Sequence, residues 1–122
     1  MKFLVSLHIN QAVLDALTAE ETAALGDGVT AFMESVKKSG ELIAAQALAA
    51  PAEAVVVAVR GGRTVTTDGP FTEAKEFLGG YYLLECASRE RAIELAARIP
   101  DAAIEGLGVE VRQVVFSDGQ LA

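Results

Sequence analysis

Three side chains of this sequence could form a small acid–base site. His8 is the only histidine in the chain, and an imidazole is the usual acid–base group near neutral pH. Asp68 supplies a carboxylate that could polarise a ligand or partner the imidazole, and Arg112 could hold an anionic group of the ligand. One His and one Cys cannot build a zinc site, so we expect no metal.

The same positions also have structural interpretations. His8 could be hydrogen-bonded at a cleft or at a subunit interface. Asp68 begins the run Asp68-Gly-Pro-Phe71, and an aspartate before Gly-Pro accepts backbone N–H bonds in a turn. Tyr82 could stack on a ring of a ligand, or pack in a core or an interface. Cys86 is expected to act as a small hydrophobic residue in a strand.

Periodicity predicts the elements that must position these residues. Residues 2–9 alternate and predict a strand with Phe3, Val5, Leu7 and Ile9 on one face and Leu4, Ser6 and His8 on the other. Capping residues Thr18 and Ser88 open helices near 19–38 and 88–98. Further strands are predicted over 41–48, 54–60, 63–67, 81–86 and 109–115, with Gly61-Gly62 as a hairpin turn and a helical turn over 72–78.

Without residues 54–78, the order is strand, helix, strand, strand, helix, strand. That order is the ferredoxin-like βαββαβ unit of α+β proteins, here with an inserted β-hairpin and Asp-Gly-Pro-Phe loop. We expect one domain over residues 1–116, with the insert at about 54–78 and a frayed tail over 117–122. Both helices should cover one face of an antiparallel sheet. The other face, with His8 and Arg112, is mixed in character and is expected to meet a partner subunit.

Composition limits the classes of partner. The chain is 52% hydrophobic and 22% charged, so its apolar excess favours a homodimer. A net charge of −7 disfavours nucleic acid and anionic membranes, because both need a basic surface. The sequence shows no signal peptide and no stretch of about 18 apolar residues. Cys86 has no second cysteine to pair with, so we expect a reducing cytoplasm.

The segment Asp68-Gly-Pro-Phe-Thr-Glu-Ala-Lys-Glu-Phe-Leu-Gly-Gly-Tyr-Tyr-Leu-Leu-Glu85 resembles the signature of the YCII-related proteins, in the branch named for its Asp-Gly-Pro-Phe run. The resemblance implies a dimeric α/β barrel, in which two sheets face each other around clefts. The acid–base pair proposed for the founding members of that family is a histidine on the first helix and an aspartate. This chain has no histidine in its first predicted helix, so the role is not carried over to His8.

The predicted function is that of a small homodimeric protein that binds a small organic ligand in a cleft between sheets. Relatives of the barrel group include monooxygenases and isomerases that work without metal or flavin, so any catalysis is expected to be cofactor-free acid–base chemistry. The alternative implied by the resemblance is a regulatory or protein-interaction module linked to a sigma factor, without catalysis. The candidate catalytic residues are His8 and Asp68, and the candidate ligand-binding residues are Gly69, Pro70, Phe71, Tyr82 and Arg112.

Overall fold

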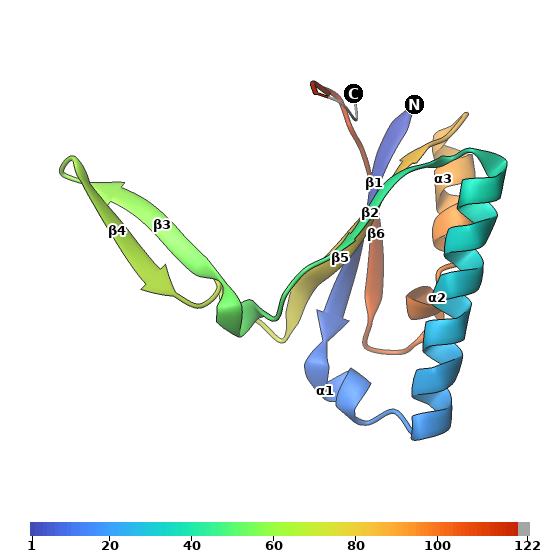
Figure 1. Ribbon diagram of the computed structural model, residues 1–122, viewed down its shortest axis with the longest axis horizontal. Helices are drawn as coiled ribbons and strands as arrows, with labels where there is room; N and C mark the ends of the chain where they lie inside the picture. The colour runs from blue at the N-terminus through green and yellow to red at the C-terminus, as the bar shows by residue number, and fades with distance from the viewer. Residues whose placement is uncertain (120–122) are drawn as a thin grey trace.

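The structure is a computed structural model that describes residues 1–119 of the chain. Figure 1 shows helices against one face of a sheet and a separate hairpin projecting from the opposite side. The sheet is antiparallel throughout, in the order β2-β5-β1-β6. Its strands are β1 (Lys2–Asn10), β2 (Leu42–Ala47), β5 (Glu76–Glu85) and β6 (Gly108–Gln113). The predicted tail falls partly on residues 120–122, which lie outside the described residues.

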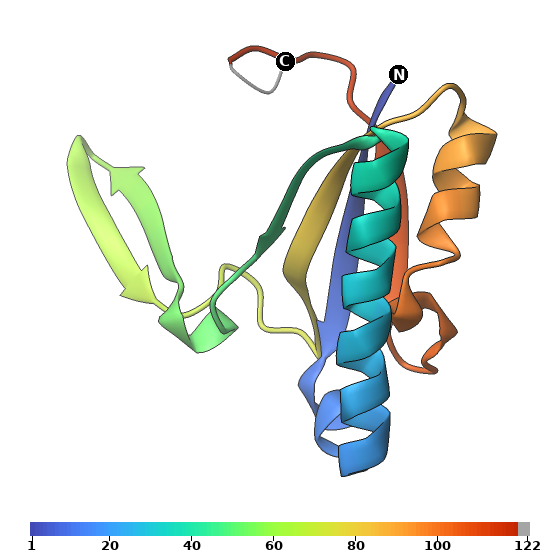
Figure 2. The ribbon, with the colours of Figure 1, turned by 45° about the vertical axis from the view of Figure 1, so that its right-hand side comes forward.

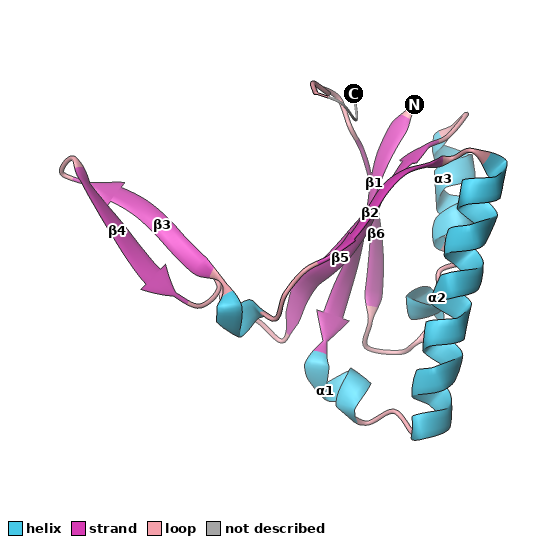
Figure 3. Ribbon diagram, viewed as in Figure 1, coloured by secondary structure: helices cyan, strands magenta, loops and turns pink. Residues whose placement is uncertain are grey.

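Three α-helices complete this α+β fold: α1 (Gln11–Asp15), α2 (Ala19–Ser39) and α3 (Arg89–Ala96). Figure 3 shows α2 and α3 on the same side of the sheet, with short α1 following the end of β1. Two 3₁₀ turns, η1 (Pro51–Glu53) and η2 (Pro100–Ala103), lie in the connections. The strand order and connections are consistent with a ferredoxin-like fold, as the order of predicted elements indicated.

Local chemistry explains where α2 begins and what it buries. The Thr18 hydroxyl accepts a 3.0 Å hydrogen bond from the Glu21 N–H, and the Glu21 carboxylate accepts a 2.9 Å bond from the Thr18 N–H. This capping box satisfies two N–H groups that have no partner within the helix. Further along, Phe32 and Val36 are one turn apart and are both buried against the sheet.

The core lies between the sheet and the two long helices. Phe3 and Val5 of β1 are both fully buried. They belong to one cluster with residues of α2 and α3, among them Phe32, Val36 and Leu95. The prediction that the odd residues of the first strand share a core with both helices is therefore confirmed for these two positions.

The helical turn predicted over residues 72–78 is wrong. Residues 72–75 form a loop, and Glu76 already begins β5, where it pairs with Asn10. The segment has good helix formers, but pairing along the end of β1 overrides that local preference. Gly79 and Gly80 therefore lie inside a strand instead of closing a helical turn, next to a register shift between Leu7 and His8.

The inserted hairpin consists of β3 (Val55–Arg60) and β4 (Arg63–Asp68), and residues 55–68 are called the arm. Gly61-Gly62 forms its turn, as predicted. At the base, the Gly69 N–H donates a 2.7 Å hydrogen bond to the Ala54 carbonyl, so the two ends of the arm lie together. Figure 2 shows that the arm also stands away from the sheet in the turned view. Every residue of the described hydrophobic core lies outside the arm.

Candidate functional site

The sheet face opposite the helices carries a group of polar side chains. Residues that face each other across antiparallel strands point to the same side of a sheet. Ser6 faces Tyr81 on β5 and Glu110 on β6, and Leu4 faces Leu83 and Arg112. We call this side, with Leu4, Ser6, His8, Tyr81, Leu83, Glu110 and Arg112, the open face. The sequence prediction that His8 and Arg112 share one face agrees with this register.

His8 is held by a neighbour on its own strand. Its Nε2 atom lies 3.2 Å from the hydroxyl oxygen of Ser6, two residues earlier on the same face. Ser6 is only 5% exposed, so its hydroxyl has a fixed environment. His8 itself is half-buried and remains within reach of a ligand on the open face. This arrangement orients an imidazole, which is a requirement for acid–base chemistry.

Glu110 is a further member of this polar group, and it faces Ser6 across β1 and β6. Its Oε1 atom accepts hydrogen bonds from Arg112 at 2.7 and 3.1 Å. The hydrogen bond from Arg112 and then the charge of Arg112 lower the pKa of Glu110, with a smaller contribution from His8. An ionised carboxylate therefore lies beside the imidazole. The equal parity of Glu110 and Arg112 on one strand indicates a shared face, but the pairing of their side chains is seen only in the structure.

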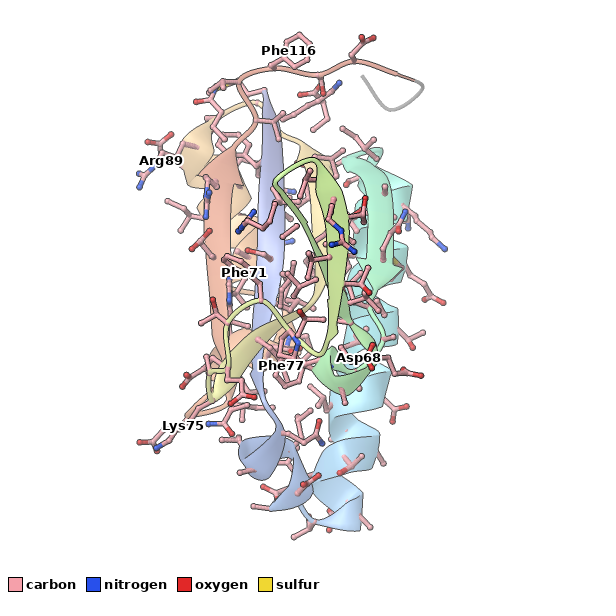
Figure 4. All side chains as sticks on the ribbon, turned by 90° about the vertical axis from the view of Figure 1, so that its left-hand side faces the viewer. Asp68, Phe71, Lys75, Phe77, Arg89 and Phe116 are labelled. Carbon is pink, nitrogen blue, oxygen red and sulfur yellow. The ribbon has the colours of Figure 1, made fainter. Side chains whose placement is uncertain are left out.

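The Asp-Gly-Pro-Phe loop begins at the base of the arm. Asp68 is the last residue of β4 and pairs with Val55. Figure 4 looks onto the open face with the arm in front, and shows Asp68 at the arm's base and Phe71 on the loop that follows. Gly69 has a φ of 103°, which L residues rarely adopt. The loop therefore needs glycine at this position for its path, as its turn interpretation predicts.

Replacing Gly69 with Ala should lower the free energy of unfolding by about 1 kcal/mol or more. A Cβ there has nothing within 4 Å, so the cost comes from the positive φ and not from a clash. Chemical denaturation followed by circular dichroism measures this change in the free energy of unfolding. Gly26→Ala is the control, because its Cβ also meets nothing within 4 Å, at an ordinary helical φ. Equal stability of the Gly69 and Gly26 variants would contradict the conformational role.

A cavity of about 570 Å³ lies between η1, the Asp-Gly-Pro-Phe loop and the start of β5. Its volume is that of a small-molecule site. Its wall is mainly apolar, and its polar side chains are Glu53, Thr72 and Glu76. Of the predicted ligand-binding residues, Pro70 and Phe71 line it. The larger apolar side chains of the wall are Leu48, Pro51, Pro70, Phe71, Phe77 and Leu78.

The cavity wall includes neither His8 nor Asp68. His8 is nevertheless the cross-strand partner of Leu78, which does line the cavity. Asp68 is two residues before Pro70, another lining residue. Within one protomer the two candidate catalytic residues thus each lie next to a lining residue, one on the sheet and one on the loop, and neither lines the cavity itself. That they line one cleft, within a protomer or across a dimer, stays a prediction.

Tyr82, a predicted ligand-binding residue, lies on the helix-facing side of the sheet. Its ring is buried and meets Phe32 edge-on, with ring centres 5.1 Å apart. Burial, and then the charge of Asp101, raises the pKa of Tyr82. It also borders a smaller cavity of about 210 Å³ under α2. The tyrosine on the open face is its neighbour Tyr81, which faces Ser6.

Other functional groups are few in the part of the chain that the structure describes. Cys86 is buried, and that burial, followed by the charge of Glu41, raises the pKa of its thiol. It fits the expected role of a small hydrophobic residue. Within residues 1–119, no three His, Cys, Asp or Glu side chains come together as metal ligands. No helix in the same range is long and apolar enough to cross a membrane.

The chain is a small α+β protein with an inserted hairpin and an Asp-Gly-Pro-Phe loop, and comparison with known sequences gives its family. The YCII-related domain family matches residues 1–117, so the chain belongs to that family. A curated relative from Rhizobium meliloti (strain 1021), described as an uncharacterized protein, is 29% identical over 122 residues. The match covers 99% of this chain and 98% of the relative. The family itself has no characterised function that could be transferred here.

Proposed function

We propose that this chain forms a homodimer that binds a small organic ligand beside the open face, with the two sheets paired as a dimeric α/β barrel. The cavity at the base of the arm is the observation that carries the proposal. At about 570 Å³ it has the size of a small-molecule site, and it has a mainly apolar wall with a few polar groups at defined places. The lone thiol Cys86 fits a reducing cytoplasm as the compartment.

The neighbouring polar group supplies orientation and possible chemistry. An apolar part of the ligand would fill the space next to Leu78, and a polar end would point across the sheet to His8. Arg112, which is largely exposed, could hold an anionic group there. His8, oriented by Ser6, would then transfer a proton without a cofactor, and Asp68 would act from the loop side.

Filling the cavity should abolish ligand binding. Leu78→Trp places an indole in the cavity, and we expect it to weaken binding of small aromatic acids at least tenfold, measured by ligand-observed NMR. Ile93→Trp on α3 is the matched control, because Ile93 is 43% exposed and Leu78 is 44% exposed. Equal binding by both variants would show that the ligand does not bind in the cavity.

A second measurement separates an enzyme from a binding protein. Any compound that binds is followed over time for conversion. His8→Gln should abolish conversion and leave most of the binding, because the glutamine keeps a polar side chain but cannot relay a proton. Conversion that persists in His8→Gln would contradict the role of His8, and binding without conversion in the unmodified protein would identify a binding protein.

The alternative is an interaction module linked to a sigma factor. Exposed valines on the arm favour some protein partner, because exposed apolar surface of this kind marks interaction sites. Purified protein incubated with a bacterial sigma factor and analysed by size exclusion distinguishes the two functions. A stable complex would support the regulatory module, and a ligand in the cavity would support the first proposal.

A further inference from the structure

The arm exposes apolar surface that a lone chain leaves in water. Val55, Val57 and Val59 are 55%, 64% and 61% exposed. An isolated two-stranded hairpin is only marginally stable in water. The arm also projects from the side of the open face, the side that a partner subunit would meet (Figure 1). These features indicate that the arm packs against another protein surface.

The apolar row has the symmetry of a two-fold contact. Val55, Val57 and Val59 alternate along β3, so they share one face of the arm. The row is symmetric about Val57. A two-fold axis at Val57 would set Val57 against its own copy and Val55 against the copy of Val59, which is the self-complementarity that an isologous dimer requires.

Charges on the arm select the direction in which two copies would pack. At the tip, Arg60 and Arg63 face each other across the turn. Within residues 1–119, neither arginine forms an ion pair. At the base are the carboxylates of Asp68 and of Glu53 in η1. Because residues alternate along a strand, Arg60 and its partner Arg63 lie on the face opposite the valine row, whereas Asp68, the partner of Val55, lies on the valine face. Parallel stacking on the valine face would set the two Asp68 carboxylates against each other, whereas antiparallel stacking brings each negative base to the partner's positive tip.

We propose that two copies of this chain stack their arms face to face and antiparallel about an axis at Val57. Each strand of the arm has six residues, so the arm is roughly 20 Å long and its tip reaches the base of the partner's arm. Glu53 also lines the 570 Å³ cavity, so the partner's tip comes to lie beside the rim of that cavity. The inference rests on the homodimer of the proposed function. It adds that the arms form a contact between the two copies and that they run antiparallel.

Cysteine cross-linking tests the geometry. Stacked sheets lie about 10 Å apart, which suits a short bis-maleimide and exceeds the reach of a disulfide. Val57→Cys should cross-link to its own copy in high yield. Val55→Cys and Val59→Cys should each fail alone and cross-link when mixed, because only unlike positions meet. The unmodified protein is the control, since its single thiol, Cys86, is buried.

Light scattering on the same samples separates the two proposals. Self-cross-linking of Val59→Cys would show parallel arms and overturn the inference. A dimer that does not cross-link at any of the three valines would overturn the arm contact and leave the homodimer standing. A mass near the 12.7 kDa of one chain at high micromolar concentration would overturn both. The expected result is a dimer with the cross-linking pattern of antiparallel arms.

Discussion

Replacing Gly80 with Ala should destabilise the fold by about 2–3 kcal/mol, an effect typical of overpacking in a well-packed site. Gly80 lies in β5 between β2 and β1, paired with Ala47 on one side and Leu7 on the other. A Cβ at this position would lie 2.6 Å from the carbonyl oxygen of Gln46 and 3.3 Å from the Cα of Ala47. Both are backbone atoms of β2, so neither can rotate away, and the two strands would have to separate.

Urea denaturation followed by circular dichroism measures the loss. Gly108→Ala in β6 is the matched control, because it is also a strand glycine and its added Cβ would come no closer than 3.9 Å to the side chain of His8. We expect that control to change the free energy of unfolding by less than 1 kcal/mol. If the Gly80 and Gly108 variants were equally stable, β2 would not approach β5 as closely as the structure shows.

The misassignment of Gly79-Gly80 shows where sequence reasoning ends. The preceding residues, Thr72 to Leu78, favour a helix by local propensity, and two glycines commonly follow a helix. This segment forms a strand because β1 extends to Asn10 and pairs with Glu76 and Phe77. A partner 66 positions away in the chain, as between Asn10 and Glu76, leaves no local signal. Short α1 was missed for a related reason, since five residues carry little periodicity.

Long periodic elements were predictable because their chemistry is local. The alternation of β1 identified its buried face, and the Thr18–Glu21 box located the start of α2. Alternation along β1 placed His8 on the open face, and alternation along β6 placed Arg112 there. It did not reveal that Ser6 orients His8 or that Glu110 is paired with Arg112, because those contacts depend on rotamers. The cavity could not be predicted from the sequence either, because its wall is built from separate segments: η1, a loop and β5.

Deleting the arm should convert the proposed dimer to a folded monomer. Residues 55–68 would be replaced by a short Gly-Ser turn between Ala54 and Gly69, whose backbones are already joined by a 2.7 Å hydrogen bond. The described hydrophobic core lies entirely outside the deleted segment, so the helices and the four-stranded sheet should still fold. Loss of three valines from each copy should raise the Kd of dimerisation by roughly a hundredfold or more.

Analytical ultracentrifugation gives the mass, and circular dichroism shows whether the helices remain. The matched variant is the triple substitution Val55→Thr, Val57→Thr and Val59→Thr, which keeps the length and strand propensity of the arm but removes its apolar face. Both variants should be monomeric and folded. A deletion variant that stays dimeric would place the contact on the open face alone. If the deletion variant unfolds while the triple variant stays folded, the arm stabilises the fold of its own chain.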